Sequence, residues 1–199
     1  MTTCYAFDLD GTLTSIELLP RIARELGIER EMAYLTRLTM DGVLDFEDSM
    51  RLRCACLRAA PIESVRAIVA DAPVDPQLAE FIHERRDRCA IVTGNLDFWI
   101  SPLVERFGCA VYSSRARITD GALDGVESVL HKGEAVLAFR QKFDRVVVVG
   151  DGVNDIPMFE VADLGVACGI VHPPAPRLVQ AANFVVNQGD ALCRLLKAL

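Results

Sequence analysis

The sequence predicts an α/β fold with a parallel sheet and a block of helices inserted after the first strand. Three observations predict this class. The chain opens on a short apolar run that ends in an aspartate-rich turn. Residues 17–71 then carry helical patterns throughout. After residue 73, apolar strands alternate with helices, which is typical of a parallel sheet because a crossover helix joins each strand to the next.

The first third of the chain holds one strand and the helical block. Residues 4–8 are apolar and aromatic and lead into LDGT, which predicts a buried parallel strand that ends in a turn. From residue 17 to residue 71 the apolar positions recur at helical spacing, and Gly27, the Asp41-Gly42 pair and Pro61 interrupt them. We therefore predict roughly four helices in this block.

The rest of the chain completes the sheet. We expect a helix over residues 77–88, a strand over 89–93 and a second strand near 110–112. Residues 113–130 alternate and contain the pair Asp120-Gly121, which favours a β-hairpin. A helix over 134–143, a buried strand over 145–150, weaker strands at 164–167 and 183–186, and a loop at 172–176 follow. These elements predict a Rossmann-like parallel-sheet core with helices on both faces over residues 1–14 and 76–199, and a small helical-bundle cap domain over residues 15–75.

Composition and charge exclude several classes of protein. At 199 residues the chain is long enough for one core with a small insert. The formal net charge of −7 disfavours broad binding to nucleic acid or anionic lipid. The opening MTTCYAFDLD has no basic region, and no apolar stretch approaches a membrane span. We expect a soluble cytoplasmic protein, a monomer or homodimer, with no nucleic-acid or membrane partner.

The cysteines do not show the spacing of a disulfide framework or of a zinc site. The chain has seven of them, scattered without a CxxC pair, and most lie in apolar strings such as CAIV and GVACG. We interpret them as reduced core residues rather than as disulfides or zinc ligands.

Polar residues gather where the predicted strands end, and ligands bind outside the carboxyl ends of strands in open parallel sheets. In DLDGT, Asp8 and Asp10 would let one carboxylate attack a substrate while the other handles protons or binds a metal, and Gly11 lets the chain turn away. The alternative for such a string by itself is an aspartate that caps a helix or a turn. The candidates at strand ends and at one helix start are Asp8, Asp10, Thr93, Gly94, Lys132, Asp151, Asn154 and Asp155.

The string GDGVNDIPMF strengthens the catalytic interpretation. It follows a four-valine strand, and the spacing of Asp151, Asn154 and Asp155 puts them on one side of a turn. If the two aspartate-bearing strand ends are neighbours, four carboxylates converge, and they could not all ionise in a partly buried cleft without a cation. A divalent metal is therefore implied. Because neither string contains histidine or cysteine, the oxygen donors point to Mg²⁺ rather than zinc.

A phosphate site would complete this edge. Lys132 and the hydroxyl of Thr93 supply a cation and a donor, and backbone N–H groups follow Gly94 at a helix start. By itself, Lys132 would be interpreted as a solvated surface lysine. Its place in order with the other strings favours the phosphate site.

The order DLDGT, VTGN, Lys132 and GDGVNDIPMF resembles the haloacid dehalogenase-like hydrolases and spans nearly the whole chain. The helical insert after the first string is similar to the cap domain of the phosphoserine phosphatase branch. In that branch a glutamate, a methionine, a phenylalanine and an arginine of the cap line the substrate pocket. The resemblance assigns these roles to Glu17, Met40, Phe46 and Arg53, which periodicity alone would place in the core or on helix surfaces.

One position departs from the branch pattern. The branch usually has a second glycine and an aromatic residue where this chain has Asn95 and Leu96. We expect this loop to face the substrate, so the departure at Asn95 leaves the identity of the leaving group open.

The resemblance implies a Mg²⁺-dependent phosphomonoester hydrolase that acts on a small amino-acid phosphate, most plainly O-phospho-L-serine. It implies that Asp8 attacks phosphorus and that Asp10 transfers protons. It also implies that Mg²⁺ is held by Asp8, the backbone carbonyl of Asp10, Asp151 and, through water, Asp155. The residues implied to hold the phosphoryl oxygens are Thr93, Gly94, Lys132 and Asn154.

Three other functions stay open at this point. An alcohol such as homoserine could intercept the aspartyl-phosphate, which would make the protein a phosphotransferase. Another small phosphate monoester could be the substrate, as the departure at Asn95 suggests. A non-catalytic binding module on the same fold is the third, since a fold alone does not prove chemistry.

Overall fold

The computed structural model describes residues 2–40 and 43–199, and of Met40 it describes the backbone alone. Within this part of the chain seven strands form one sheet with the order β4-β3-β2-β1-β5-β6-β7. Adjacent strands are parallel except for the pair β3 and β4. The strands are β1 (Thr3–Phe7), β2 (Cys89–Leu96), β3 (Ala110–Thr119), β4 (Ala122–Ser128), β5 (Arg145–Gly150), β6 (Leu164–Cys168) and β7 (Phe184–Val186).

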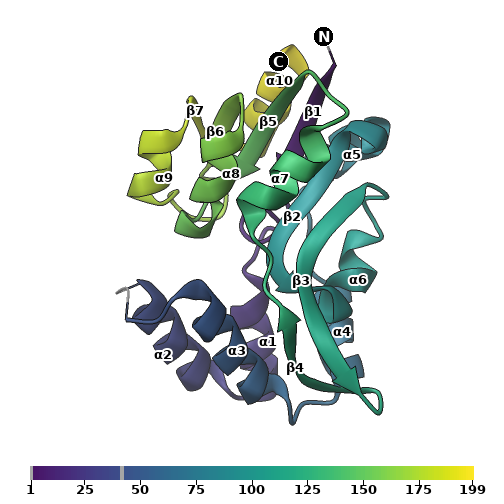
Figure 1. Ribbon diagram of the computed structural model, residues 1–199, viewed down its shortest axis with the longest axis vertical. Helices are drawn as coiled ribbons and strands as arrows, with labels where there is room; N and C mark the ends of the chain where they lie inside the picture. The colour runs from purple at the N-terminus through teal and green to yellow at the C-terminus, as the bar shows by residue number, and fades with distance from the viewer. Residues whose placement is uncertain (1, 41–42) are drawn as a thin grey trace.

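Helices cover both faces of the sheet (Figure 1), so the predicted α/β class is confirmed. Successive side chains of a strand point to opposite faces. Tyr5 and Phe7 of β1 therefore pack in one cluster with α5 (Pro76–Glu84), α6 (Asp97–Val104) and α10 (Gly189–Ala198). Cys4 and Ala6 pack on the other face with α7 (Lys132–Arg140), α8 (Ile156–Val161) and α9 (Pro176–Ala181). Both clusters are buried, which explains the continuous apolar runs of the central strands.

The described part of the block between residues 17 and 71 contains four helices, as predicted. They are α1 (Leu18–Leu26), α2 (Glu29–Met40), α3 (Phe46–Leu57) and α4 (Ile62–Ala70). Figure 1 shows this helical block below the carboxyl ends of the central strands. The block also packs against the rest of the molecule, through α4 on α6 and through α3 on β4. The division into a cap over residues 15–75 and a core therefore stays a prediction.

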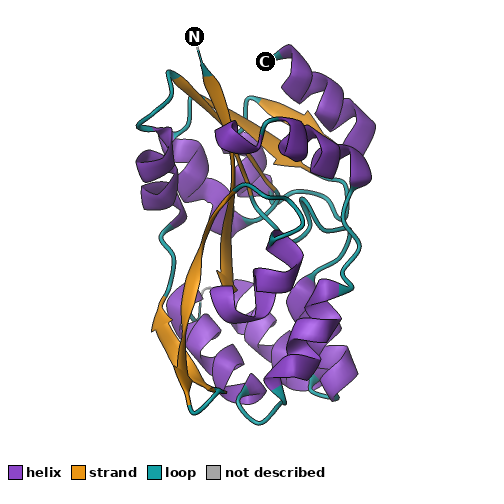
Figure 2. Cartoon of the chain, turned by 90° about the vertical axis from the view of Figure 1, so that its right-hand side faces the viewer, coloured by secondary structure: helices purple, strands orange, loops and turns teal. Residues whose placement is uncertain are grey.

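The segment after residue 110 differs from the prediction of a short strand followed by a separate hairpin. One continuous strand, β3, pairs in parallel with β2 and then in antiparallel with β4. Figure 2 shows this long hairpin beside the helical block. The predicted turn is present, and Asp120 and Gly121 both have positive φ (51° and 77°), as a two-residue type I′ turn requires. Strand β2 also continues to Leu96, beyond the predicted end at residue 93.

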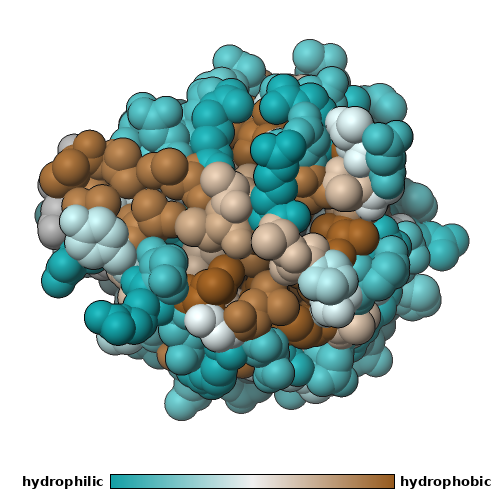
Figure 3. Space-filling view, turned by 90° about the horizontal axis from the view of Figure 1, so that it is seen from below, coloured by the Kyte–Doolittle hydropathy of each residue, from teal (hydrophilic) through white to brown (hydrophobic). Residues whose placement is uncertain are grey.

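Apolar side chains reach the surface on the helical block. The face seen from below in Figure 3 carries a broad apolar area, and the exposed large apolar residues of this block are Tyr34, Val43 and Leu52. Five of the seven cysteines are buried, as predicted for core residues, and two are partly buried. Among the described residues, no helix is both long and apolar enough to span a lipid bilayer.

Candidate active site

The carboxyl ends of β1, β2 and β5 meet at one edge of the sheet. The chain adds β2, β3 and β4 on one side of β1 and β5, β6 and β7 on the other, so the switch point of the topology lies beside β1. Asp8 directly follows β1, and its N–H donates to the Val149 carbonyl of β5 at 2.9 Å. Asp151 directly follows β5. Both aspartate side chains are buried, and the topology therefore brings the two predicted strings together.

Lys132 joins these strings through two buried ion pairs. Its Nζ lies 2.6 Å from Asp8 Oδ1 and 2.6 Å from Asp155 Oδ1, and the side chain is 4% exposed. Lys132 is the first residue of α7, whose start lies at the same sheet edge. Burial alone would lower the pKa of Lys132, but the charges of Asp155 and Asp8 raise it above its ordinary value. Lys132 is therefore a permanent cation between the two carboxylates.

Asp155 holds the turn that follows β5. Its Oδ2 accepts hydrogen bonds from the N–H groups of Asp151 and Gly152, each at 2.9 Å. Its Oδ1 accepts from Lys132, so both carboxylate oxygens already have partners within the protein. Asn154 lies on the same short 3₁₀ turn (Val153–Asp155), and its side chain is exposed.

The site holds more negative charge than its lysine can balance. Oxygen atoms of Asp8, Asp151 and Asp155 lie within 4.8 Å of one another. Burial and the charge of Asp155 raise the pKa of Asp151 to about 7. Burial also raises the pKa of Asp8 well above its ordinary value, and the charge of Asp155 adds to this while Lys132 opposes it. A buried cluster of carboxylate oxygens with this excess charge fits a divalent cation.

Asp10 lies two residues after Asp8 and interacts electrostatically with Glu17. Burial, followed by the charge of Glu17, raises the pKa of Asp10 to about 8. Its Oδ2 accepts a hydrogen bond of 2.9 Å from Asn95 Nδ2. Its Oδ1 is buried and has no hydrogen-bond partner in the described part of the chain. At neutral pH this carboxyl can carry a proton.

Two of the predicted pocket residues reach this edge from the helical side. The ring of Phe46 covers Gly94, where a Cβ atom would collide with it, so the glycine allows this close approach. Glu17 lies near Gly11, whose φ of 66° suits a glycine. Met40 was predicted to join them, but its side chain lies outside the described residues.

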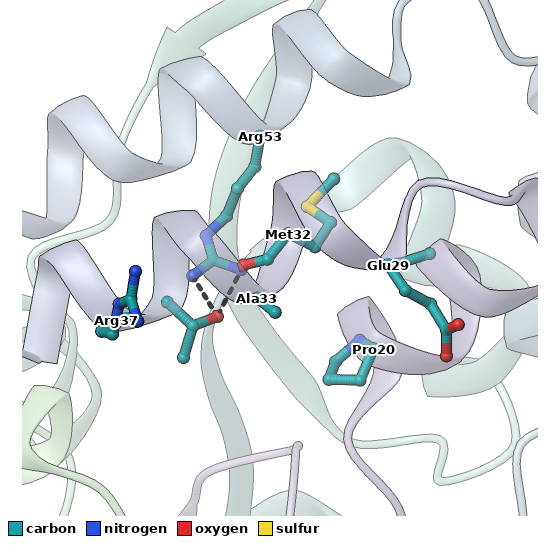
Figure 4. A pocket seen from close by; sticks show the side chains of 8 residues that line it. Pro20, Glu29, Met32, Ala33, Arg37 and Arg53 are labelled. Atoms are coloured by element: carbon teal, nitrogen blue, oxygen red, sulfur yellow. Dashed lines mark hydrogen bonds between the residues drawn. The ribbon is translucent and has the colours of Figure 1, made fainter.

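Arg53 lines a cavity within the helical block. Its Nε donates to Ser49 Oγ at 3.1 Å, and its Nη2 donates to Thr36 Oγ1 at 2.9 Å. Figure 4 shows the guanidinium at the side of a cavity of about 530 Å³ between α1, α2 and α3. The structure therefore gives Arg53 partners on helices α2 and α3.

This arrangement of motifs matches a known family. Residues 5–160 match the sequence profile of the family described as haloacid dehalogenase-like hydrolase. The chain belongs to the haloacid dehalogenase-like hydrolases. The resemblance inferred from the four strings is thus confirmed.

Relatives of this hydrolase are phosphoserine phosphatases. The one of Methanocaldococcus jannaschii is 34% identical, with 92% of each chain covered. That of Halobacterium salinarum is 32% identical, with 98% of this chain and 97% of the relative covered. A solved structure described as a phospho-aspartyl intermediate analogue of phosphoserine phosphatase has a TM-score of 0.83 and 32% identity, and covers 100% of this chain and 98% of its own. The hydrolase is therefore a member of the phosphoserine phosphatase branch.

The sequence analysis missed one residue of this hydrolase's site. His172 Nε2 lies 2.9 Å from Asp151 Oδ2 and 3.0 Å from Glu17 Oε1, so it joins the core to the helical block. It belongs to the proline-rich segment that was predicted only as a loop. The sequence carries one indication of this role. The loop follows the predicted strand β6, and because β6 is parallel to β5 its carboxyl end lies at the same sheet edge.

Asn95 differs from its expected place. The prediction was a loop that faces the substrate, yet Asn95 lies in β2 and its side chain is 4% exposed. Its amide contacts Asp10, Thr93 and Trp99. The longer strand explains the difference, because it carries the residue into the protein interior.

Proposed function

We propose that this hydrolase converts O-phospho-L-serine to L-serine and phosphate with the help of Mg²⁺. One observation carries the proposal: a buried aspartate, Asp8, ends the central strand with the Lys132 ammonium at 2.6 Å and a second carboxyl, Asp10, two residues on. The names of the relatives support the choice of substrate. The earlier alternatives, a phosphotransferase and a hydrolase of another monoester, are outcomes of the test below.

Asp8 is the proposed nucleophile. Its carboxylate oxygen forms a bond to phosphorus while the bond from phosphorus to the serine oxygen breaks, which leaves an aspartyl-phosphate. Lys132 supports this step, because its Nζ holds Asp8 Oδ1 and fixes the side chain. The same cation offsets the negative charge that spreads over the phosphoryl oxygens.

Asp10 is the proposed general acid and base. Because burial and Glu17 raise its pKa to about 8, the protonated form dominates at neutral pH and can donate to the leaving alkoxide. The carboxylate that remains then takes a proton from the water that attacks the aspartyl-phosphate. One group thus serves both half-reactions.

The carboxylate cluster is the proposed Mg²⁺ site. Asp8, the backbone carbonyl of Asp10 and Asp151 would hold the ion, with Asp155 acting through water. The bond partners of Asp155 support this indirect role, since both of its oxygens already accept protein hydrogen bonds. When bound, the ion neutralises charge on the phosphoryl group. The residues proposed to hold the phosphoryl oxygens are Thr93, Gly94, Lys132 and Asn154.

The helical block is the proposed cap. Residues 15–75 would close over the substrate and exclude water. Glu17 would pair with the substrate ammonium and Arg53 with its carboxylate, while Phe46 and Met40 line the pocket. The contact of Phe46 with Gly94 supports a cap that meets the core at the phosphate site. A location in the cytoplasm, and a monomeric or homodimeric state, stay predictions.

The test is phosphate release from a panel of amino-acid and sugar phosphates, with Mg²⁺, with Ca²⁺ and with excess chelator. We expect phosphoserine to be turned over fastest, Ca²⁺ to substitute poorly and chelator to stop the reaction. Faster turnover of a sugar phosphate would overturn the substrate, and full activity in chelator would overturn the metal. Formation of homoserine phosphate when homoserine is added would favour the phosphotransferase. No turnover of any monoester would favour a binding module.

A further inference from the structure

Asn95 makes a buried hydrogen-bond network that links β2 to the proton-transfer residue. Its Nδ2 donates to Asp10 Oδ2 at 2.9 Å and to Thr93 Oγ1 at 3.1 Å. Its Oδ1 accepts from Trp99 Nε1 at 3.3 Å. Asn95 is 4% exposed and Trp99 is 0% exposed. Both N–H groups of the amide and its oxygen are therefore used inside the protein.

Trp99 decides which way the amide faces. An indole N–H can only donate, so the atom of Asn95 that it contacts must be the oxygen. The NH₂ group then has to point toward Asp10. A rotated amide would place its oxygen against a carboxylate oxygen and its NH₂ against the indole N–H, which leaves two unfavourable contacts in place of two hydrogen bonds.

The two oxygens of Asp10 become unequal as a result. Oδ2 faces a donor, and a proton on that oxygen would compete with the amide N–H. Oδ1 is buried and has no hydrogen-bond partner among residues 2–40 and 43–199, so within these residues the bond from Asn95 is the one that holds the carboxyl in place. We propose that Asn95, oriented by Trp99, is a positioning residue that fixes the Asp10 carboxyl for proton transfer.

This inference rests on the proposed function of Asp10 and deepens it. As the Asp8 oxygen bonds to phosphorus and the bond to the leaving oxygen breaks, the proton passes from the Asp10 carboxyl to that leaving oxygen. The electron pair of the O–H bond stays on Asp10, which is then the base for the attacking water.

A comparison of two leaving groups tests the inference. An alkoxide needs a proton to leave, whereas p-nitrophenolate does not. The measurement is the rate of phosphoenzyme formation in rapid mixing, with p-nitrophenyl phosphate and with the alkyl phosphate that the native protein hydrolyses fastest. For Asn95→Leu we expect the alkyl reaction to slow on the order of 10- to 100-fold, with KM unchanged and the aryl burst within about 3-fold of native.

Trp99→Phe and Ser114→Ala complete the design. Trp99→Phe keeps the ring but removes the N–H, so the amide can turn and the same selective loss is expected, to a smaller degree. This variant decides the question if Asn95→Leu does not fold. Ser114 is a buried control on the neighbouring strand, where its hydroxyl donates to the Gly94 carbonyl at 2.8 Å and accepts from the Leu130 N–H at 3.0 Å. We expect any slowing by Ser114→Ala to be the same for both substrates.

Equal slowing of both substrates by Asn95→Leu and Trp99→Phe, or no slowing, overturns the positioning role. Because the alkyl substrate is chosen by the native rate, failure to hydrolyse phosphoserine would overturn the proposed substrate and leave the test of Asn95 intact. Absence of any phosphatase turnover by the native protein overturns both proposals.

Discussion

The sheet edge and the helical block hold their polar side chains in different ways. At the edge, Lys132 binds Asp8 across 124 positions of sequence, and both side chains are buried. On α3, Arg51 pairs with Glu47 four positions away, and both are close to half exposed. The contacts at the edge thus depend on the whole fold, while many contacts of the block depend on one helix or on two neighbouring helices. Changes in the block can therefore alter specificity without disturbing the chemistry.

The largest effect is expected from Asp8→Asn, which removes the proposed nucleophile. An amide neither attacks phosphorus well nor binds Mg²⁺, so turnover and trapping of a phosphoenzyme should both disappear. The measurement is steady-state phosphate release together with acid-quench trapping, and circular dichroism checks the fold. Activity at a sizeable fraction of the native rate would show that Asp8 is not the nucleophile. The sheet edge could then no longer be contrasted with the helical block as the place of the chemistry.

The free energy of unfolding tests whether the buried ion pairs of the sheet edge stabilise the fold more than an exposed pair of the helical block. Lys132→Met leaves the Asp8 and Asp155 carboxylates buried without their cation, and should lower the free energy of unfolding by roughly 3–5 kcal/mol. Glu47→Gln is the matched control on α3, because it weakens the exposed pair with Arg51, which contributes about 1 kcal/mol or less, and leaves the bond from Arg51 to the Val126 carbonyl in place. Urea unfolding at pH 8 without metal measures both. Equal losses would show that the two regions do not differ in this way.

Arg53→Ala tests the helical block as the source of specificity. A desolvated pair between an arginine and a substrate carboxylate is worth roughly 2–5 kcal/mol, so kcat/KM for phosphoserine should fall on the order of 30-fold to several-thousand-fold. Turnover of a generic aryl phosphate should barely change, since the sheet edge is untouched. An equal loss on both substrates would mean that Arg53 supports the fold through Ser49 and Thr36 instead.

The smallest effect for a single group concerns the buried thiols in both regions. Burial raises the pKa of Cys54, Cys89 and Cys168 to about 12, above the ordinary value of 9.0. Between these values the unfolded chain loses protons that the folded chain keeps, so stability is full below pH 9 and falls as the pH rises toward 12. From pH 9 to pH 10 we expect a loss of roughly 1 kcal/mol for each thiol, measured by urea unfolding with reductant present.

The same thiols can separate the two regions. Cys54 lies in α3 of the helical block, whereas Cys89 and Cys168 lie in strands of the sheet. If residues 15–75 open as a unit, a maleimide should label Cys54 in mild urea before it labels the other two. Simultaneous labelling of all three would argue against a separate cap.

The sequence predicted the parts of the molecule that depend on local pattern. Apolar runs and helical spacing predicted β1, β5 and the helices α1 to α4, and the strings DLDGT and GDGVNDIPMF predicted which carboxylates share an edge. What it could not predict depends on contacts between distant segments. The place of His172 follows from how the loop after β6 folds over Asp151, and the amide of Asn95 is oriented by Trp99 of α6. The partners of Arg53 likewise depend on how α2 packs on α3.

The long insertion between β1 and β2 has a consequence for synthesis on the ribosome. Strand β1, which ends just before Asp8, is made before its neighbours in the sheet, β2 and β5, which begin at Cys89 and Arg145. Until β2 is made, β1 has no neighbouring strand to pair with. Helices α1 to α4 can form during this time, because their contacts are close in sequence. A nascent chain in this state exposes an apolar strand edge and depends on timely completion of β5 to avoid association with other chains. The buried pairing of Lys132 with Asp8 and Asp155 is correspondingly among the last contacts to form.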